Sequence, residues 1–220
     1  MPGWPPAAEG EEDRVDGLDW HSYAQRMRAV MLEVPEPLLD ERRRLGLDGL
    51  DELWNGVLHM VPPPSFVHQT IGSELTGFLK PRLAVRGIKM LHDTGVFRPG
   101  SRGRDYRVPD LVFFPADRPE LVSERGIEGP ALCVVEIRSP EDETYEKMPF
   151  YAELGIGEMI VIEPRKRAVE LYRLAGAGYL ATSANETGRL HAATIDVRFV
   201  TLAGAEPRLR VECHGEAIEI

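Results

Sequence analysis

The sequence has little cysteine and no long apolar run, and both absences narrow what the protein can be. Cys133 and Cys213 are the only cysteines, and no Cys-x-x-Cys or Cys/His spacing indicates a zinc site. No stretch approaches the roughly 20 apolar residues of a membrane helix. The first residues lack the basic start and apolar stretch of a secretory signal. We therefore expect a cytoplasmic protein without a membrane span, in which Cys133 is a buried, reduced thiol.

Length and composition are those of an ordinary folded protein. The 220 residues are 43% hydrophobic and 28% charged, which allows one domain of the larger kind. Residues 1–17 combine Pro, Gly, Ala and Glu with little apolar content, which predicts a disordered leader. We expect a single domain over residues 18–220, with its core at about 50–175.

The charge is unevenly distributed along the chain. The formal net charge is −10, which argues against a protein that coats nucleic acid. Residues 80–107 nevertheless hold eight basic residues against two aspartates, so this segment carries +6 and the remainder −16. A basic segment beside an acidic site would suit a polyanionic substrate. The alternative is a solvated helix face followed by an arginine-rich loop.

The N-terminal part of the domain is expected to combine helices with a hairpin. Apolar residues recur at helical spacing over residues 19–32, and a second, short helix is expected at about 40–45. Asn55 and Gly56 are a typical two-residue turn within the run 52–61, which predicts a hairpin there.

The remaining elements predict a mixed sheet with a helix on each side. Ser65 can cap a helix whose apolar stripe continues to Leu79 and which Pro81 bends or ends. Further elements are expected as strands at about 88–92, 107–114, 131–137, 158–163 and 168–174, a helix at about 145–154, and two or three short strands after 178. The order lacks regular strand–helix alternation, which predicts a mixed α+β fold: a central mixed β-sheet flanked by helices, an N-terminal helix and hairpin, and a C-terminal β extension.

Two carboxylates lie in apolar runs that have the character of strands. Asp110 follows Pro109, and Glu136 lies 26 residues later between Val135 and Ile137. A buried strand rarely keeps an acid unless its charge is offset, because isolating a charge from water costs several kcal/mol. If the two strands pair, the carboxylates converge, and a hard divalent cation is the partner that such oxygens favour.

These residues resemble the motif of the PD-(D/E)XK nuclease superfamily. The chain is similar, more narrowly, to a large bacterial family of restriction-endonuclease-like proteins that is especially numerous in cyanobacteria. The segments that carry this likeness are 134–140, 145–147, 150–156 and 158–164, with Glu52, Gly56, Pro63, Pro64 and His68 upstream. The two-acid motif alone has low specificity, whereas the linked series in this order is more specific. The likeness covers about residues 50–175.

The resemblance implies a restriction-endonuclease-like core and a metal-dependent endonuclease that hydrolyses phosphodiester bonds of DNA. Asp110 and Glu136 would hold Mg²⁺ (or Mn²⁺), with the carbonyl of Ile137 as a third oxygen. In such a site the metal lowers the pKa of bound water and stabilises charge on the phosphate. A nearby cationic side chain orients the nucleophile and offsets the developing negative charge.

The chain departs from the superfamily where a lysine should follow the glutamate by two residues. Arg138 stands there instead. Arginine can clamp a phosphate, but it does not lose its proton and so cannot act as a base. Lys147 matches the lysine of the narrower family, so the resemblance implies that Lys147 is the catalytic cation and Arg138 a phosphate contact.

Other candidate residues carry less specific signals. Glu52 matches an acidic residue of the family and is a possible third acid, a surface glutamate at a strand end being the alternative. His68 opens a helix, where a capping or solvent-facing histidine is the favoured interpretation over a site residue. The candidate nucleic-acid contacts are the arginines that precede Asp110, namely Arg98, Arg102, Arg104 and Arg107.

A second interpretation keeps the fold but not the activity. A catalytically inactive nuclease-fold module could bind nucleic acid or protein as a regulator, since fold alone does not settle activity. The acidic net charge and Arg138 favour this alternative, whereas the retained acids and Lys147 favour the endonuclease, which we prefer. A homodimer is expected in either case, because two-fold dimers are the commonest assemblies and restriction-type nucleases often pair to cut both strands.

Overall fold

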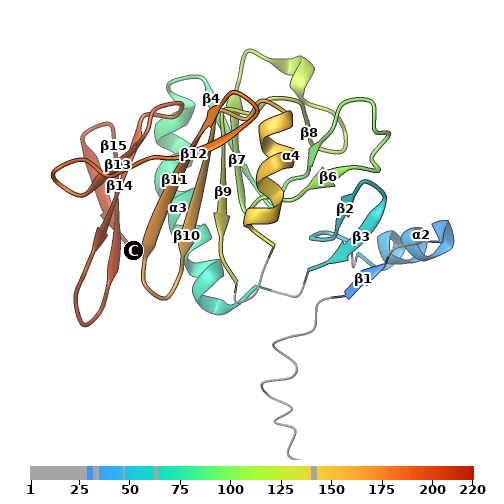
Figure 1. Cartoon of the computed structure of the whole chain (residues 1–220), viewed down its shortest axis with the longest axis horizontal. Helices are drawn as coiled ribbons and strands as arrows, with labels where there is room; N and C mark the ends of the chain where they lie inside the picture. The colour runs from blue at the N-terminus through green and yellow to red at the C-terminus, as the bar shows by residue number, and fades with distance from the viewer. Residues whose placement is uncertain (1–28, 32–34, 47, 62–63, 140–142) are drawn as a thin grey trace, which may run out of the picture.

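A six-stranded mixed sheet forms the centre of the molecule (Figure 1). The computed structural model describes residues 29–31, 35–46, 48–61, 64–139 and 143–220. In the spatial order β12-β11-β10-β9-β7-β4, the strands of the central sheet are β12 (Gly178–Ala181), β11 (Ala168–Ala175), β10 (Glu158–Glu163), β9 (Cys133–Ile137), β7 (Leu111–Pro115) and β4 (Ile88–His92). Strands β9 and β10 are parallel and the other neighbours antiparallel, which confirms the predicted mixed sheet.

Helices α3 (Phe66–Ala84) and α4 (Met148–Glu153) cover opposite faces of this sheet (Figure 1). Successive strand residues point to opposite faces. Accordingly Cys133 and Val135 of β9 belong to the hydrophobic cluster that includes α3, and Val134 belongs to the cluster that includes α4. Glu136 follows the alternation of Val134, so its side chain points to the α4 face.

Helix α3 begins where the sequence predicted. The hydroxyl of Ser65 accepts a hydrogen bond from the backbone N–H of His68 (3.3 Å) and so caps the helix. Ile71, Leu75 and Leu79 are fully buried against the sheet. Pro81 lies inside the helix without ending it, because the helix continues to Ala84.

A second six-stranded sheet contains the predicted hairpin. Its strands are β1 (Ala29–Met31), β3 (Val57–Met60), β2 (Glu52–Trp54), β6 (Tyr106–Arg107), β5 (Val96–Phe97) and β8 (Ile127–Glu128), in that spatial order. Strands β2 and β3 form the hairpin, with Asn55 at φ 51° and Gly56 at φ 88°. Both residues of a type I′ turn need positive φ, so the Asn55-Gly56 dipeptide was sufficient to predict the hairpin. The expected short helix is present as α2 (Glu36–Leu45).

A third sheet closes the α3 face at the C-terminal end of the chain. It consists of β13 (Arg189–Ala192), β14 (Val197–Leu202), β15 (Arg208–Cys213) and β16 (Glu216–Glu219), all antiparallel. Its residues Phe199 and Val211 belong to the same buried cluster as Ile71 of α3. The prediction of two or three strands after residue 178 was too low: β12 and these four strands make five.

Two other expectations about elements need correction. Ala29–Met31 were expected to end a helix, but they pair with β3 as strand β1, since pairing with a remote strand outweighs local apolar spacing. The other residues of that expected helix lie outside the described residues. The leader expected over residues 1–17 also lies outside them. The strand expected over 107–114 is two strands of different sheets, β6 and β7, with Asp110 in the connection between them.

The described helices include none that is long and apolar enough to cross a membrane. Two short 3-10 helices complete the described structure: η1 (Pro119–Leu121) and η2 (Tyr145–Lys147), which leads into α4.

The buried carboxylate of Glu158 ties β10 to the turn after β13. It accepts hydrogen bonds from the backbone N–H groups of Ala193 (3.0 Å) and Thr194 (2.8 Å) and from Arg173 Nε (2.9 Å). Burial alone raises the pKa of Glu158, but these hydrogen bonds lower it by more, so the net pKa is below the ordinary 4.5. A depressed folded pKa stabilises the fold above the unfolded pKa, and this contribution is lost as pH falls through the folded value.

We therefore predict that Glu158→Gln lowers the free energy of unfolding by about 2 kcal/mol at neutral pH, because hydrogen bonds to a charged acceptor are replaced by weaker ones. The difference from wild type should shrink as pH falls below 4.5. Urea unfolding at neutral pH and near pH 3 measures both values, with the exposed Glu186→Gln as control. An equal loss of stability at both pH values would contradict the prediction.

Candidate functional site

Asp110 and Glu136 lie at the same end of the central sheet. Antiparallel pairing of β7 with β9 joins Leu111 to Val135, so the two acids lie one residue beyond this last pair. Pro109 precedes Asp110 in the connection between β6 and β7 and cannot donate to a ladder. The break between the two strands leaves the Asp110 carboxylate free to turn toward the sheet end.

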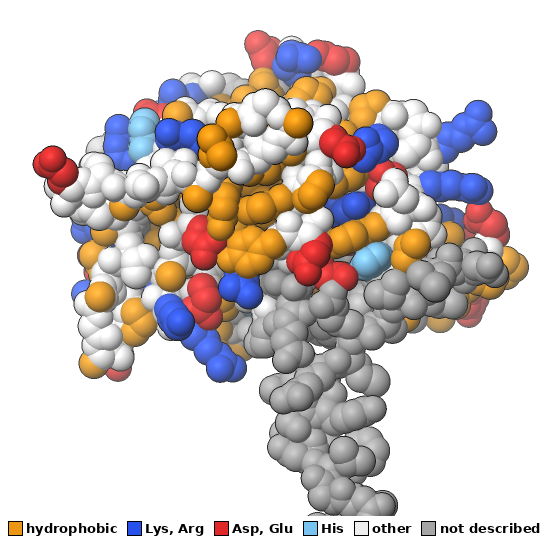
Figure 2. All heavy atoms as spheres, in the orientation of Figure 1, with side chains coloured by type: hydrophobic (Ala, Val, Ile, Leu, Met, Phe, Trp, Pro, Cys, Tyr) orange, Lys and Arg blue, Asp and Glu red, His pale blue; other side chains and the backbone are white. Residues whose placement is uncertain are grey.

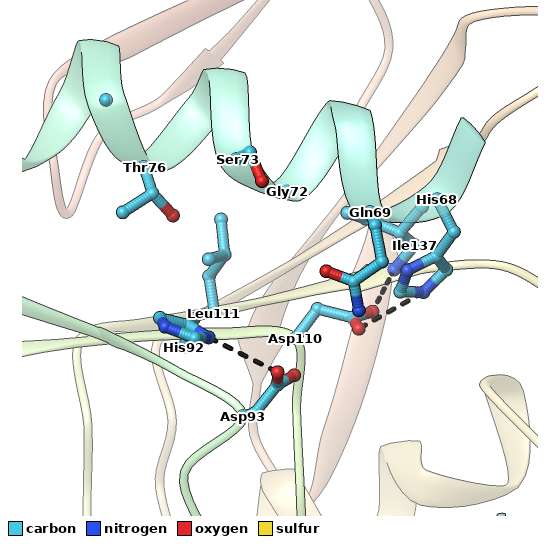
Figure 3. Close-up of a pocket in the computed structure, with 11 residues that line it drawn as sticks. His68, Gln69, Gly72, Ser73, Thr76, His92, Asp93, Asp110, Leu111 and Ile137 are labelled. Atoms are coloured by element: carbon cyan, nitrogen blue, oxygen red, sulfur yellow. Dashed lines mark hydrogen bonds and ion pairs between the residues drawn. The ribbon is translucent and has the colours of Figure 1, made fainter. Parts of the chain in front are cut away.

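The two carboxylates hydrogen-bond to opposite helices. Asp110 Oδ1 lies 3.1 Å from Nε2 of His68 in α3, and Asp110 Oδ2 accepts from the backbone N–H of Ile137 (Figure 3). Glu136 instead accepts from Lys147 Nζ (3.0 Å) and from the hydroxyl of Tyr151 in α4 (2.6 Å). The structure thus brings Lys147 to Glu136, whereas Asp110 occupies an adjoining position on the other side of the sheet end.

The Lys147 ammonium is shared by two buried acids. Its Nζ lies 2.8 Å from Glu52 Oε1 and 3.0 Å from Glu136 Oε2. Glu52 is held in place by Trp54 Nε1 (2.7 Å) and the backbone N–H of Val108 (2.8 Å). The side chain of Glu52 is only 3% exposed, so the alternative of a surface glutamate at a strand end is wrong.

Burial and acidic neighbours perturb the pKa of Glu136. Burial raises the pKa of Glu136 to about 8; Lys147 opposes this rise, and the charges of Asp110 and Glu52 add to it. Burial lowers the pKa of Lys147, but Glu136 and Glu52 raise it by more, so the ammonium stays charged at neutral pH. Burial and the nearby acids raise the pKa of Tyr151, which remains a hydroxyl donor. A further cation near Glu136 would therefore favour its ionised form.

The interpretation of His68 as a capping or solvent-facing residue is wrong. Its ring is buried and pairs with Asp110, while only its backbone N–H takes part in the cap. Burial lowers the pKa of His68, but the hydrogen bond and charge of Asp110 raise it by more. The sequence contained a signal for the burial of His68, because residues 68, 71 and 75 follow helical spacing on the buried face of α3.

Sequence reasoning also missed Tyr151. It lies four residues after Lys147, and two side chains at this spacing share one face of a helix. Both reach Glu136, so the spacing could have identified Tyr151 once Lys147 was assigned.

Arg107 is not available to nucleic acid, which corrects its assignment as a contact. Its guanidinium lies 4.2 Å from the ring centres of both Trp54 and Phe150 and donates to the carbonyl of Leu53 (3.0 Å). Burial lowers the pKa of Arg107, although Glu52 and Asp105 oppose the change. Arg107 thus attaches the β2–β3 hairpin to α4.

The basic segment 80–107 does not form an open strip of positive charge. Arg98 pairs with Asp105 and Glu153, both at 2.6 Å, and Arg86 pairs with Asp196 (3.3 Å). Figure 2 shows positive and negative side chains interspersed over the face in view. Arg102 and Arg104 are exposed, Arg104 in a pair with Glu36 (3.2 Å), and both remain predicted contacts.

The oxygen donors at the sheet end fit a hard divalent cation. Mg²⁺ is usually held by one or two carboxylates and keeps several waters. Asp110, Glu136 and the carbonyl of Ile137 supply oxygens of this kind. The described part of the chain holds no group of three or more His, Cys, Asp or Glu placed to bind a metal, which leaves at most a site completed by water.

Comparison with known proteins gives a matching family model and a similar solved structure. A family model described as "Uma2: Putative restriction endonuclease" matches residues 49–201. Among solved structures, one described as a "putative nuclease belonging to DUF820" from Anabaena variabilis is similar at 19% sequence identity and a TM-score of 0.49, over 58% of this chain and 74% of that chain. No curated protein matches.

We predict that Lys147→Met destabilises the protein strongly, by about 3 kcal/mol, because it leaves two buried carboxylates without their counter-ion. Urea unfolding at neutral pH measures the loss. Lys80→Met on the exposed side of α3 is the matched control and should change stability by no more than about 0.5 kcal/mol. Equal effects of the two substitutions would show that the shared ammonium does not stabilise the fold.

Proposed function

The chain belongs to the Uma2 family of restriction-endonuclease-like proteins, and from this premise we propose that it is a metal-dependent endonuclease that hydrolyses phosphodiester bonds of DNA. The observation that carries the proposal is the contact of Lys147 Nζ with Glu136, at the same sheet end as Asp110. A lysine beside an acid pair is the arrangement that the family resemblance requires, although here the lysine comes from η2 rather than from β9.

Asp110 and Glu136, with the carbonyl of Ile137, would hold Mg²⁺ or Mn²⁺. When bound, such a metal supplies a water of lowered pKa and stabilises charge on the phosphate. Tyr151 and Lys147 orient the Glu136 carboxylate from one side of the sheet. His68 and the N–H of Ile137 orient the Asp110 carboxylate from the other.

Lys147 acts in this proposal as a fixed positive charge. Its raised pKa keeps the ammonium protonated at neutral pH, so it offsets negative charge on the phosphate rather than accepting a proton. Arg138, which follows directly after β9, is proposed as a phosphate contact; its guanidinium lies 5.0 Å from the ring centre of Tyr145. Arg102 and Arg104 are proposed contacts to the DNA backbone outside the site.

A second candidate function is a module that binds without cleaving. One observation favours it: both oxygens of Glu136 already accept hydrogen bonds from Lys147 and Tyr151. A carboxylate has further lone pairs for a metal, but such binding requires Glu136 to be ionised against its raised pKa. Homodimer formation, which would allow both strands of a duplex to be cut, is proposed for either function and is measured by light scattering.

We expect supercoiled plasmid to be nicked or linearised with Mg²⁺ or Mn²⁺ and not with EDTA. Glu136→Gln should lower the cleavage rate at least about 100-fold, because it removes the negative charge of a ligand without changing the size of the side chain. Glu186→Gln, on an exposed loop, should cleave at the wild-type rate. Cleavage by Glu136→Gln at the same rate as wild type would indicate a contaminating nuclease and count against this site.

Metal binding should also be visible without cleavage. A ligand that binds only the folded state at about 100 times its Kd stabilises that state by about 2.7 kcal/mol. Mn²⁺ should therefore raise the melting temperature of wild type and of Asp117→Asn, an exposed control, but not of Asp110→Asn. If Asp110→Asn shows the wild-type shift in differential scanning fluorimetry, Asp110 is not a ligand.

A further inference from the structure

A pocket of about 350 Å³ opens directly beside Asp110 (Figure 3). One wall is formed by Gln69, Ser73 and Thr76 of α3, and the facing wall by His92 and Asp93 at the end of β4. Its volume is that of a small-ligand site. The pocket therefore extends from the proposed phosphate position and is large enough for part of a substrate.

The α3 wall presents free hydrogen-bonding groups. Gln69, Ser73 and Thr76 recur at i, i+4 and i+7, which places them on one face of the helix. Within the described residues, none of these three side chains has a hydrogen-bond partner. Gly72 lies between them, and its missing side chain leaves room above Ile137. Their amide and hydroxyl groups are thus available to an occupant.

The charge of the pocket disfavours a phosphate as its occupant. No lysine or arginine is among the lining residues, whereas Asp93 and Asp110 are. The backbone N–H of Asp93 donates to the carbonyl of Asp110 (3.1 Å), which fixes the two residues side by side. A phosphate inside the pocket, away from a cation bound at the sheet end, would be repelled by both carboxylates. Neutral groups and a carboxylate instead suit a base edge that carries an amino group.

We propose that this pocket receives one unpaired nucleobase with an exocyclic amino group (cytosine, adenine or guanine) next to the phosphate at Asp110; this rests on the proposed nuclease function. A glutamine amide forms paired hydrogen bonds with adenine, and a carboxylate accepts from the amino group of cytosine. Gln69 and Asp93 are the groups of these types in the pocket. Thymine has no amino group and offers a single donor, its N3–H, so it makes fewer of these contacts.

An occupant of this kind implies a single-stranded substrate or a locally opened duplex. A base inside a duplex keeps its pairing edge toward its partner and enters a pocket only when it leaves the stack. Arg102 lines a neighbouring pocket on the far side of Asp93 and has no partner among the described residues. Its guanidinium is available to the phosphate of an adjacent nucleotide.

The test measures binding in EDTA, so that hydrolysis cannot interfere. Fluorescence anisotropy would compare labelled oligo(dC), oligo(dA) and oligo(dT) of about ten nucleotides with a duplex of the same length, a length within the range that single-strand sites cover. We expect oligo(dC) and oligo(dA) to bind about tenfold more tightly than oligo(dT), which lies within the range of discrimination that one good base contact contributes. The duplex should bind more weakly than all three.

Three variants locate the binding in this pocket. Ser73→Trp fills it and should weaken oligo(dC) and oligo(dA) binding about tenfold, to the level of oligo(dT). Gln69→Ala should remove the preference for oligo(dA) over oligo(dT) and retain that for oligo(dC). Thr70→Trp, at a position of α3 that does not line the pocket, is the matched control and should bind as wild type does. Circular dichroism melting confirms that each variant is folded.

The possible outcomes distinguish a failure of the pocket proposal from a failure of the proposed nuclease function. Equal binding of all oligonucleotides, tighter binding of the duplex, or no binding at all would overturn the pocket proposal. Cleavage of single strands by Ser73→Trp with an unchanged KM and base preference would also overturn it, while the nuclease function stood. Base-selective binding that Ser73→Trp abolishes, in a protein that never cleaves with Mn²⁺, would support the pocket and contradict the nuclease.

Discussion

The organisation of the site depends on one ammonium group shared by two buried carboxylates. Lys147 reaches Glu52 of the hairpin and Glu136 of the central sheet, and so joins elements that lie far apart in the sequence. Burying these charges is costly unless each finds a partner with good geometry. Burial raises the pKa of Glu136; Lys147 opposes this rise, and the charges of Asp110 and Glu52 add to it. The same contacts hold the hairpin against α4, and a further cation at the sheet end would favour the ionised form of Glu136.

The hairpin is held at the site by packing as well as by charge. Arg107 lies between the rings of Trp54 and Phe150, and Trp54 in turn donates to Glu52. Burying a guanidinium between two rings gains cation–π attraction that is stronger when water is excluded. Arg107, which the sequence predicted as a nucleic-acid contact, thus helps to position Glu52 beside Lys147.

Local chemistry made part of the fold predictable from sequence. Asn55-Gly56 indicated the hairpin, Ser65 indicated the start of α3, and β-branched runs indicated the strands of the central sheet. The family resemblance singled out Lys147, and the structure places it against Glu136.

The sequence alone could not predict contacts between segments that lie far apart in the chain. Strand β1 forms because it pairs with β3, against its local helical spacing. The pair of His68 with Asp110 joins α3 to the residue before β7; helical spacing could indicate that His68 is buried, but not which residue it contacts. The proposed endonuclease function requires that Asp110 and Glu136 hold one divalent cation between the two faces of the sheet end. Anomalous scattering from a crystal soaked in Mn²⁺ tests it most directly: a single peak within about 2.5 Å of an oxygen of each carboxylate is predicted. A protein that orders Mn²⁺ elsewhere, or on only one of the two acids, would contradict it.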